Sequence, residues 1–515
     1  MNGAELIMRT ARKAGIDTCF TNFGTTEMPL AVAFDTEPGV KPILGLFEGV
    51  CTGAADGYGR MTDKPAMTLL HLGPGFANGV AYLHNAKRAK TPLLNLVGEH
   101  TTHHVHLDAP LSMNIEALAG TISGWYKTNQ SPIELSQDFA DAFVASLYGQ
   151  ISTLIIPNDY QQMKITDVEV AVPRFGFDPV DGDSIEGAAR LIRENHNVAL
   201  LIGGRALRSR GLKAAARIKS LKGCDLLTDY LPGYLERGVG FPEITRIPYF
   251  PEPAMELLSG YDAVVICGTK EPVGFFGYKG ISGKLLSENQ PRVLINSNKQ
   301  NPIEALECLA ETLGCSEDIS PGVTAKRCYP AVPQGELTAE KACQTLAAIQ
   351  PEGAIIVDEG VSSAFPYYSL SHGLLPHTMI TIAGGSIGHG MPCSIGAAMA
   401  SPDRPVINLE ADGSAMYTVQ ALWTQAKQGL NITTLICANR RYNILKLELE
   451  RAGITPVGPT VSSLIDIENP HIEWTKMAEA MGVAAVSVNT AAQLAHEIQG
   501  ALSEAGPHLI EMVLK

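Results

Sequence analysis

The chain has 515 residues, of which 45% are hydrophobic and 50 are glycine, and its formal net charge is −14. This length predicts two to four domains, and the composition is that of a globular protein with large cores. The negative charge argues against nucleic acid or an anionic membrane as a partner, because either would select a basic surface.

Two further features bear on where the protein works. The first fifteen residues have the pattern of an amphipathic helix and lack the apolar stretch of a signal peptide. No apolar run approaches the roughly 20 residues of a membrane span. The ten cysteines are scattered without a Cys-x-x-Cys pair, as expected for thiols in a reducing compartment. We therefore expect a soluble, cytoplasmic protein with no membrane partner.

Two stretches rich in proline and glycine, 157–182 and 320–335, divide the chain. We expect domains over 1–165, 183–320 and 336–515, each near the usual domain size. Each part alternates short β-rich runs with helical patterns, which predicts an α/β fold in which every domain has a mostly parallel sheet with helices on both faces. The clearest predicted strands are 42–46, 67–71, 92–97, 198–202, 263–267 and 354–357.

Two titratable residues lie at predicted strand ends in the first part. Glu48 follows the strand 42–46 and opens a helix of small residues, and His71 closes the strand 67–71. The helix dipole stabilises a carboxylate at a helix N-terminus whatever its role. An imidazole can transfer protons near neutral pH, although a histidine at a strand end is more often structural.

The next segments are ambiguous. His100, His103, His104 and His106 crowd one loop, where a zinc site is a weak interpretation because no cysteine or spaced carboxylate completes a tetrahedral set. The loop could instead line an active-site entrance, with His104 or His106 relaying protons. In the middle part, Gly203-Gly204-Arg205 is too short for a dinucleotide fingerprint.

The last part begins with segments that suit a phosphate-bearing ligand. Ser362 and Ser363 follow the strand 354–357, where their hydroxyl groups either bind diphosphate or cap a helix. The glycine-rich segment 383–396 predicts a turn into a helix and contains Gly385 and Ile387. Its glycines would allow the backbone to approach a ligand closely.

Asp412 and Asn439 each follow an apolar run that predicts a buried strand, 404–410 and 432–438. Residues 417–428 between them predict a helix. Such a unit places both side chains at the carboxyl edge of a parallel sheet, where open α/β sheets bind ligands. A carboxylate and an amide oxygen suit Mg²⁺, which completes its shell with waters and phosphate oxygens. The alternative is an ordinary helix cap at Asp-Gly-Ser.

These motifs resemble those of thiamine diphosphate (ThDP) enzymes. Ala411-Asp412-Gly413-Ser414 followed by Asn439 resembles the Gly-Asp-Gly…Asn signature. Glu48 and the segment 54–60, Ala-Ala-Asp-Gly-Tyr-Gly-Arg, resemble the family's Glu-(seven residues)-Ala-Asp-Gly-Tyr-Ala-Arg segment. The resemblance covers nearly the whole chain and points to acetolactate synthases and benzoylformate decarboxylases, especially to short acetolactate synthase large subunit-like proteins. Ala411 and Ala438 replace a Gly and an Asn of the pattern, and neither removes a ligand oxygen.

The resemblance implies a set of contacts with ThDP and Mg²⁺. The metal ligands would be Asp412, Asn439 and the carbonyl oxygen of Arg441. The other cofactor contacts would come from Gly385, Ile387, Ser362, Ser363, Gly413 and Ser414, with Ile387 supporting the bent cofactor. Glu48 would hydrogen-bond the aminopyrimidine and drive it to its imino tautomer.

On the substrate side, Thr25 and His71 match a catalytic serine and an active-site histidine of benzoylformate decarboxylase. A second histidine of that enzyme is missing, because Phe275 or Phe276 stands near its position. The flavin-associated motifs of acetolactate synthases are also missing, so we do not expect FAD. Glu448 replaces a bulky apolar residue, which indicates either a pocket less suited to an aromatic acid or a solvated helix face.

We therefore expect a ThDP- and Mg²⁺-dependent enzyme that decarboxylates 2-oxo acids to an enamine, which is released as aldehyde or captured by a second carbonyl. The alternative is an acetolactate synthase-like carboligase without FAD. A non-catalytic subunit and a nucleotide-dependent dehydrogenase are more distant interpretations. The resemblance also implies a homodimer or homotetramer in which Glu48 of one chain faces the Asp412 site of the next.

Overall fold

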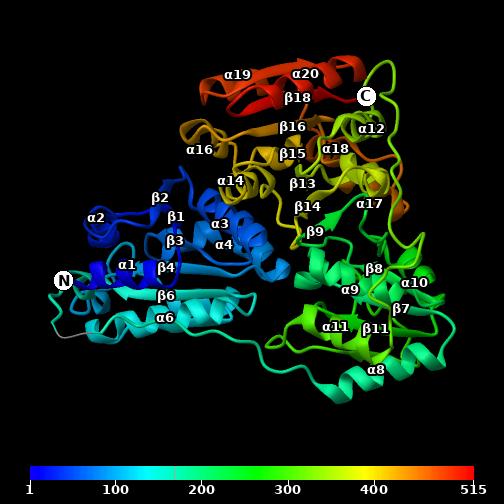
Figure 1. Ribbon diagram of the computed structural model, residues 1–515. Helices are drawn as coiled ribbons and strands as arrows, with labels where there is room; N and C mark the ends of the chain where they lie inside the picture. Colours follow the sequence, from blue (N-terminus) through cyan, green and yellow to red (C-terminus); the bar gives the residue numbers. More distant parts are fainter. Residues whose placement is uncertain (167–168) are drawn as a thin grey trace.

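The structure is a computed structural model that describes residues 1–166 and 169–515. Its strands form three sheets of six, five and seven strands, with helices packed against them (Figure 1). Among the described residues, every pairing between named strands is parallel except that of β14 with β9. The α/β fold with mostly parallel sheets that the sequence predicts is therefore confirmed.

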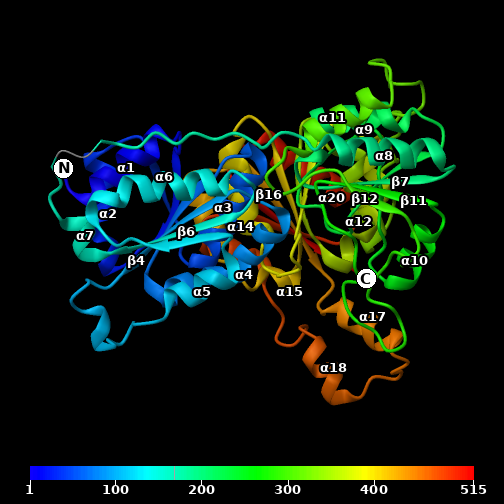
Figure 2. The same ribbon diagram turned by 90° about the horizontal axis from the view of Figure 1, so that it is seen from below.

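The first sheet has the order β2-β1-β3-β4-β6-β5. Helices α1 and α6 cover one face with a core that includes Leu6 and Phe139, and α3 and α4 cover the other around Val50 and Phe76 (Figure 2). The strands are β1 Thr18–Asn22, β2 Lys41–Leu44, β3 Ala66–Leu70, β4 Leu93–Glu99, β5 Trp125–Thr128 and β6 Ile151–Pro157. The helices are α1 Gly3–Lys13, α2 Met28–Thr36, α3 Glu48–Thr62, α4 Leu72–Ala89, α5 Ile115–Ile122, α6 Leu135–Ser146 and α7 Asn158–Gln162.

The second sheet has the order β10-β8-β7-β11-β12. One face packs against α8, α9 and α11, and the other against α10 through Ala254 and Leu258. The strands are β7 Val198–Ile202, β8 Cys224–Thr228, β10 Thr245–Arg246, β11 Ala263–Cys267 and β12 Arg292–Leu294. The helices are α8 Gly182–Glu194, α9 Ser209–Lys219, α10 Pro251–Ser259 and α11 Pro302–Thr312.

The third sheet has the order β17-β18-β16-β15-β13-β14-β9. Its last strand, β9 (Leu235–Arg237), comes from the middle of the chain and pairs antiparallel with β14. The other strands are β13 Ile355–Glu359, β14 His377–Thr381, β15 Val406–Ala411, β16 Ile432–Ala438, β17 Ala484–Val488 and β18 His508–Val513. The helices are α12 Ala339–Ile349, α13 Phe365–Leu370, α14 Gly390–Ala400, α15 Asp412–Ala415, α16 Ala421–Gln428, α17 Asn443–Arg451, α18 Pro459–Ile465, α19 Trp474–Ala480 and α20 Ala491–Ser503.

One predicted helix is shorter than expected. The pattern predicts a helix over 417–428, but α16 begins at Ala421, and residues 416–420 form turns. Within those turns the hydroxyl of Thr418 donates a hydrogen bond to the carbonyl of Gly388 at 2.7 Å. This tertiary contact ties the turn to the glycine-rich segment, and no periodicity in the sequence reports it.

Helices α3 and α14 lie between the first and third sheets and pack so closely that their backbones are in contact. A Cβ atom on Gly57 would lie 2.0 Å from the carbonyl oxygen of Cys393, and one on Gly396 would lie 1.8 Å from that of Ala54. Between the helices, buried Asp56 pairs with Arg60 at 2.6 Å and with the ring of His389 at 2.7 Å. Burial alone would raise the pKa of Asp56, but Arg60 and His389 outweigh it and lower the pKa to about 2.

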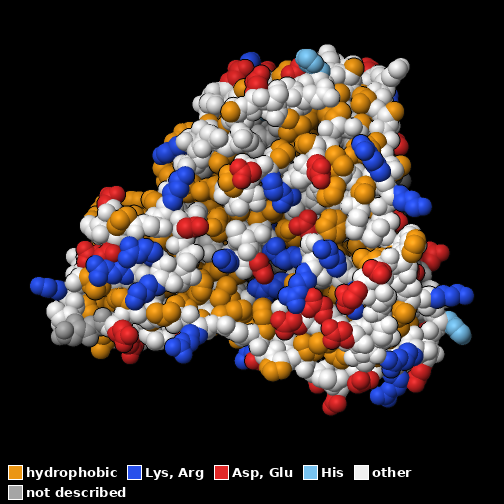
Figure 3. Space-filling model, viewed as in Figure 1, with side chains coloured by type: hydrophobic (Ala, Val, Ile, Leu, Met, Phe, Trp, Pro, Cys, Tyr) orange, Lys and Arg blue, Asp and Glu red, His pale blue; other side chains and the backbone are white. Residues whose placement is uncertain are grey.

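On the face shown in Figure 3, acidic and basic side chains are interspersed, and neither kind dominates. Within residues 1–166 and 169–515, none of the helices combines the length and the apolar character that crossing a membrane requires.

Candidate active site

A cavity of about 60 Å³ lies at the carboxyl ends of β13, β15 and β16 in the third sheet. The sequence predicted that strand ends would bring polar residues together at this edge, and seven predicted residues line the cavity. They are Ser362, Ile387, Asp412, Gly413, Ser414, Asn439 and Arg441. Ser363 lies beside them, because its hydroxyl accepts a hydrogen bond from the side-chain amide of Asn439 at 3.3 Å.

Asp412 is the buried acidic residue of this cavity, with 2% of its surface exposed. Its Oδ1 accepts from the backbone N–H of Gly413 at 2.8 Å, and its Oδ2 accepts from that of Arg440 at 2.6 Å. Burial raises the pKa of Asp412 to about 6 in spite of these donors. A cation at this position would compensate for the lost hydration of the carboxylate.

The loop after β16 places further oxygen atoms near Asp412. The side-chain Oδ1 of Asn439 accepts from the backbone N–H of Arg441 at 3.0 Å, which fixes the direction of the amide. The side chain of Asn443, at the start of α17, donates to the hydroxyl of Ser362 at 3.3 Å. These contacts join the loop after β13 to the loop after β16 across the cavity.

Three non-glycine residues with a positive φ adjoin predicted site residues. They are Leu72 at 50°, directly after His71; Val361 at 47°, directly before Ser362; and Arg440 at 57°, directly after Asn439. A positive φ is strained for any residue with a Cβ, most of all for a β-branched residue such as Val361. Such strain clusters at ligand-binding sites, where the surrounding fold holds it in place.

Glu48 is the first residue of α3, as the sequence predicts. Its Oε2 accepts a hydrogen bond from the side-chain amide of Asn78 at 3.0 Å. A Cβ on Gly75 would lie 3.1 Å from the other carboxylate oxygen, so this glycine leaves the room that Glu48 occupies. Neither Glu48 nor His71 is among the described residues that line the Asp412 cavity of the same chain.

His71 lies at the end of β3 and forms an ion pair with Glu27, with His71 Nδ1 2.7 Å from Glu27 Oε2. Glu27 is completely buried and also accepts from the backbone N–H of Gly24 at 2.9 Å. The hydrogen bond that the ring of His71 donates to the Glu27 carboxylate raises the pKa of His71 above its ordinary value. The carboxylate of Glu27 therefore favours the protonated form of an imidazole that is 23% exposed.

Comparison with known proteins agrees with this geometry. The chain matches the thiamine pyrophosphate enzyme families for the N-terminal TPP binding domain over residues 1–121 and for the C-terminal TPP binding domain over 365–512. It is 41% identical over 520 residues to IlvX of Mycobacterium tuberculosis, which is named provisionally as an acetolactate synthase large subunit, with 100% of this chain and 99% of the relative covered. The chain belongs to the ThDP enzyme family.

Other members of the ThDP family share the full length. Benzoylformate decarboxylase of Pseudomonas aeruginosa is 26% identical, with 97% of this chain and 96% of the relative covered. The structure of a ThDP-dependent 4-hydroxybenzoylformate decarboxylase of Rhodococcus jostii matches the fold with a TM-score of 0.87 at 23% identity, covering 100% of this chain and 99% of that one. The resemblance inferred from the sequence is thus confirmed.

The residues of this ThDP enzyme fit the cofactor at the Asp412 cavity. A carboxylate, an amide oxygen and a backbone carbonyl form the hard oxygen set that Mg²⁺ prefers. A Cβ on Gly413 would lie 2.4 Å from the ring of Tyr442, so only glycine leaves the backbone open at this turn. The hydroxyl groups of Ser362 and Ser363 add donors suited to a diphosphate.

Sequence reasoning missed the partner of His71 in this ThDP enzyme. It named Thr25 as a substrate-side residue through the resemblance, and Thr25 is exposed and has no side-chain hydrogen bond within the described part of the chain. The hydroxyl that lies 3.2 Å from His71 Nδ1 belongs to the next residue, Thr26, and the carboxylate to Glu27. The only local signal was a glutamate three residues after Gly24, which reads as a helix cap.

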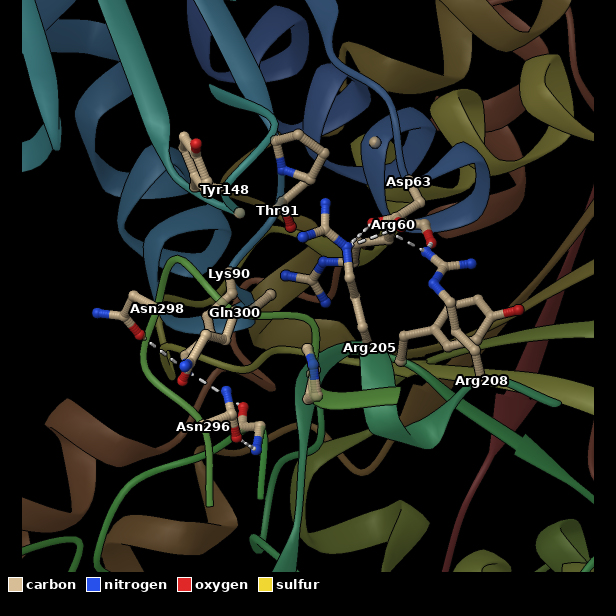
Figure 4. Close-up of a pocket in the computed structure, with 18 of the residues that line it drawn as sticks. Arg60, Asp63, Lys90, Thr91, Tyr148, Arg205, Arg208, Asn296, Asn298 and Gln300 are labelled. Carbon is tan, nitrogen blue, oxygen red and sulfur yellow. Dashed lines mark hydrogen bonds and ion pairs between the residues drawn. The ribbon is translucent and has the colours of Figure 1, made fainter. Parts of the chain in front are cut away.

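A second cavity, of about 50 Å³, lies where the first part of the ThDP enzyme meets the middle part (Figure 4). Its positive charges already have partners in the protein. Arg205 donates to both carboxylate oxygens of Asp63 at 2.8 Å, and Lys90 donates to the carbonyl of Gly268 at 3.1 Å. Arg208 lies over the ring of Tyr234, 4.3 Å from its centroid. This cavity is part of the packing between domains.

Proposed function

We propose that the chain is a ThDP- and Mg²⁺-dependent 2-oxo-acid decarboxylase that releases an aldehyde. The observation that carries the proposal is the meeting of Asp412, Asn439, Ser362 and Ile387 around one cavity at a sheet edge. ThDP would supply the electron sink for breaking the bond between a carbonyl carbon and a carboxylate. The protein would supply geometry and proton transfer.

In this proposal, different residues of the cavity would bind the metal ion, the diphosphate and the rings of the cofactor. Asp412, Asn439 and the carbonyl oxygen of Arg441 hold Mg²⁺. The diphosphate lies against Gly413, Ser414, Ser362 and Ser363. Ile387 supports the thiazolium side and Gly385 approaches the pyrimidine, where its φ of 72° favours glycine.

We place Glu48, His71 and Thr25 opposite that cavity, contributed by a second copy of the chain. Large apolar side chains are exposed on both halves: Met28 (57%) and Leu46 (46%) in the first part, Tyr417 (52%) and Leu445 (47%) in the last. Mutual coverage in a homodimer, or in a homotetramer built from it, would bury both sets. Glu48 would then hold the aminopyrimidine nitrogen of the partner's cofactor.

The raised pKa of His71 beside Glu27 supports decarboxylation to an aldehyde, because release requires a proton donor near the former carboxylate. An acetolactate synthase-like carboligase is the second candidate. It is favoured by the lack of a second histidine, since Phe275 or Phe276 stands near the position of that residue in benzoylformate decarboxylase. Phe275 lies against Gly385: a Cβ on Gly385 would be 2.9 Å from the tip of its ring.

The test is CO₂ release from a panel of 2-oxo acids in the presence of ThDP and Mg²⁺, with the products identified. Pyruvate, 2-oxobutyrate, branched-chain 2-oxo acids, benzoylformate and phenylpyruvate would be compared, with and without acceptor aldehydes. Free aldehyde establishes the decarboxylase, and acetolactate or another acyloin establishes the carboligase. Cofactor binding without turnover of any acid would contradict both.

We propose further that the enzyme works without FAD. The structure does contain a cleft of about 860 Å³ at the carboxyl ends of β8, β11 and β12, so the space alone does not decide this point. The purified enzyme should show no flavin absorbance near 450 nm and full activity without added FAD. A flavin spectrum, or activation by FAD, would overturn this part.

A further inference from the structure

Glu448, on α17, is a half-buried carboxylate surrounded by aromatic side chains. The hydroxyl of Tyr278 donates to its two oxygens at 3.0 and 3.2 Å, and the hydroxyl of Tyr249 donates to Oε1 at 3.3 Å. In the described part of the chain no lysine or arginine forms an ion pair with it. Arg451, one turn further along α17, pairs instead with Glu252 at 2.5 Å. We call Glu448, Tyr249 and Tyr278 the carboxylate cluster.

The neighbouring Glu450 shows what a solvated glutamate looks like on the same helix. It is exposed and pairs with Lys446 at 3.7 Å, one turn before it. Such surface pairs contribute little to stability. Glu448 differs because its charge faces two phenol groups from the central domain rather than solvent and a lysine. The interpretation of Glu448 as part of a solvated helix face is therefore the weaker one.

The carboxylate cluster is connected to the proposed cofactor site from two directions. Tyr249 packs against Phe275 with ring centroids 5.2 Å apart, and the tip of Phe275 lies against Gly385. From the other side, α17 begins at Asn443, whose side chain reaches Ser362. Phe275 is 43% exposed, so the cluster borders an exposed apolar side chain beside the cofactor position.

Carboxylate chemistry determines what this surface can recognise. An ionised carboxylate accepts at about four lone-pair positions, and the two tyrosine hydroxyls have only two hydrogens to donate, that of Tyr278 being shared between both oxygens. Acceptor capacity therefore stays free, and no lysine or arginine in the described part of the chain forms an ion pair with Glu448, because Arg451, which acts on its charge from over the Tyr278 ring, is paired with Glu252. A ligand group that donates a hydrogen bond would be attracted to this carboxylate, and a second carboxylate would be repelled.

We propose that the enzyme selects 2-oxo acids whose distal end carries a hydrogen-bond donor, a hydroxyl or ammonium group, and that Glu448 is the residue that reads this group. The same carboxylate excludes 2-oxo dicarboxylic acids. The inference rests on the proposed function and narrows it to a substrate class. Tyr249 and Tyr278 are positioning residues that orient the carboxylate.

Series of substrates that differ only in the distal group measure the effect of that group on catalysis. In a five-carbon series, 5-hydroxy-2-oxopentanoate, 2-oxopentanoate and 2-oxoglutarate differ only at the far end. In a ring series, benzoylformate carries a para hydrogen, hydroxyl, methoxy or carboxylate group. We expect kcat/KM for the hydroxyl member to exceed that for the hydrogen and methoxy members by about tenfold, because a hydrogen bond to a charged acceptor discriminates by at least this factor. The carboxylate member should be the poorest in each series.

Glu448→Gln removes the charge and keeps the size of the side chain. We expect the preference for the hydroxyl member and the discrimination against the carboxylate member each to fall by about tenfold. Glu450→Gln is the matched control, since it removes one charge from the exposed face of the same helix and should leave both ratios unchanged. Tyr278→Phe should weaken the preference less than Glu448→Gln, because Tyr249 still orients the carboxylate.

Equilibrium binding of the same acids to the ThDP-loaded enzyme, measured by calorimetry, separates this inference from the proposed function. A hydroxyl preference in binding that disappears in Glu448→Gln supports the inference even if no acid releases CO₂, an outcome that would reject the proposed function alone. Equal binding and turnover across each series would overturn the inference. So would a hydroxyl preference that persists unchanged in Glu448→Gln.

Discussion

Glu27 and His71 form an ionisable pair at the end of the first sheet, and the two side chains differ in their exposure to solvent. The carboxylate is fully buried, whereas the imidazole is partly exposed. A buried carboxylate that accepts from Nδ1 leaves Nε2 as the nitrogen available to the outside. The exposed nitrogen of His71 is thus the one that would exchange protons.

Glu27→Gln should lower the pKa of His71, because the neutral amide no longer stabilises the imidazolium. In the folded wild-type protein the pKa of His71 is raised, so the pair stabilises the fold below the unfolded pKa of histidine. This stabilisation is lost as the pH rises through the folded pKa. Imidazole titration by NMR would measure the shift, and kcat should fall about tenfold near neutral pH. An unchanged titration curve in the variant would refute the coupling.

Asp412 supports a second prediction at the level of one residue, through ligand removal. Saturating ThDP and Mg²⁺ should raise the melting temperature of the wild-type protein, with about 2.7 kcal/mol of stabilisation at one hundred times the dissociation constant. Removal of Mg²⁺ with a chelator should abolish most of this gain. Asp412→Ala should show no gain at all, whereas Glu450→Gln should behave as wild type. A full gain in Asp412→Ala would exclude the proposed metal site.

At the scale of elements, the α3–α14 contact decides how the first and third sheets meet. The two helices approach so closely that Gly57 and Gly396 have carbonyl oxygens in the place of a side chain. The buried Asp56–Arg60 pair and His389 lie in the same interface. This close contact sets the relative position of the sheet edges that carry Glu48 and Asp412.

Gly57→Ala should destabilise the protein by about 1–3 kcal/mol or more, since the added Cβ meets backbone atoms that cannot rotate away. Gly500→Ala is the matched control, because Gly500 lies within α20 and a Cβ added there would meet no other atom within 4 Å. That control should stabilise by about 0.5–1 kcal/mol through helix propensity. Chemical denaturation of both variants would measure the difference. Equal changes in the free energy of unfolding would show that the close packing of α3 on α14 does not contribute to stability.

At the scale of the whole molecule, the proposed active site requires two chains. The Asp412 cavity and the Glu48–His71 edge are separate in one chain, and each is bordered by exposed apolar side chains. A symmetric dimer would pair each edge with the cavity of the other chain. The assembly, rather than the single fold, would then be the catalytic unit.

Mixing two inactive variants tests this assembly. Glu48→Gln and Asp412→Ala should each be inactive alone. When the two chains are co-expressed, half of the dimers are mixed, and each mixed dimer has one intact site and one site with both substitutions. About a quarter of the wild-type activity should return. No recovery in dimers shown to be mixed would mean that Glu48 and Asp412 act within one chain.

The sequence alone determined the fold class, eight of the eighteen strands in the described residues and, through the resemblance of its motifs, the cofactor family. Buried parallel strands are continuous apolar runs, so β7, β11 and β16 were predicted to the residue. The polar residues at the ends of β15 and β16 were also predictable, because parallel neighbours end at the same sheet edge. Residue type and spacing along the chain are sufficient to predict such features.

Only the tertiary structure decided which side chains meet across the fold. The sequence did not single out Glu27, which is the buried partner of His71, and it left Glu448 open between a pocket residue and a solvated helix face, whereas Glu448 faces two tyrosines. The late start of α16 depends on Thr418 bonding the distant Gly388. Each of these features depends on residues far apart in the sequence, and burial and charge pairing act through space, which periodicity along a chain does not record.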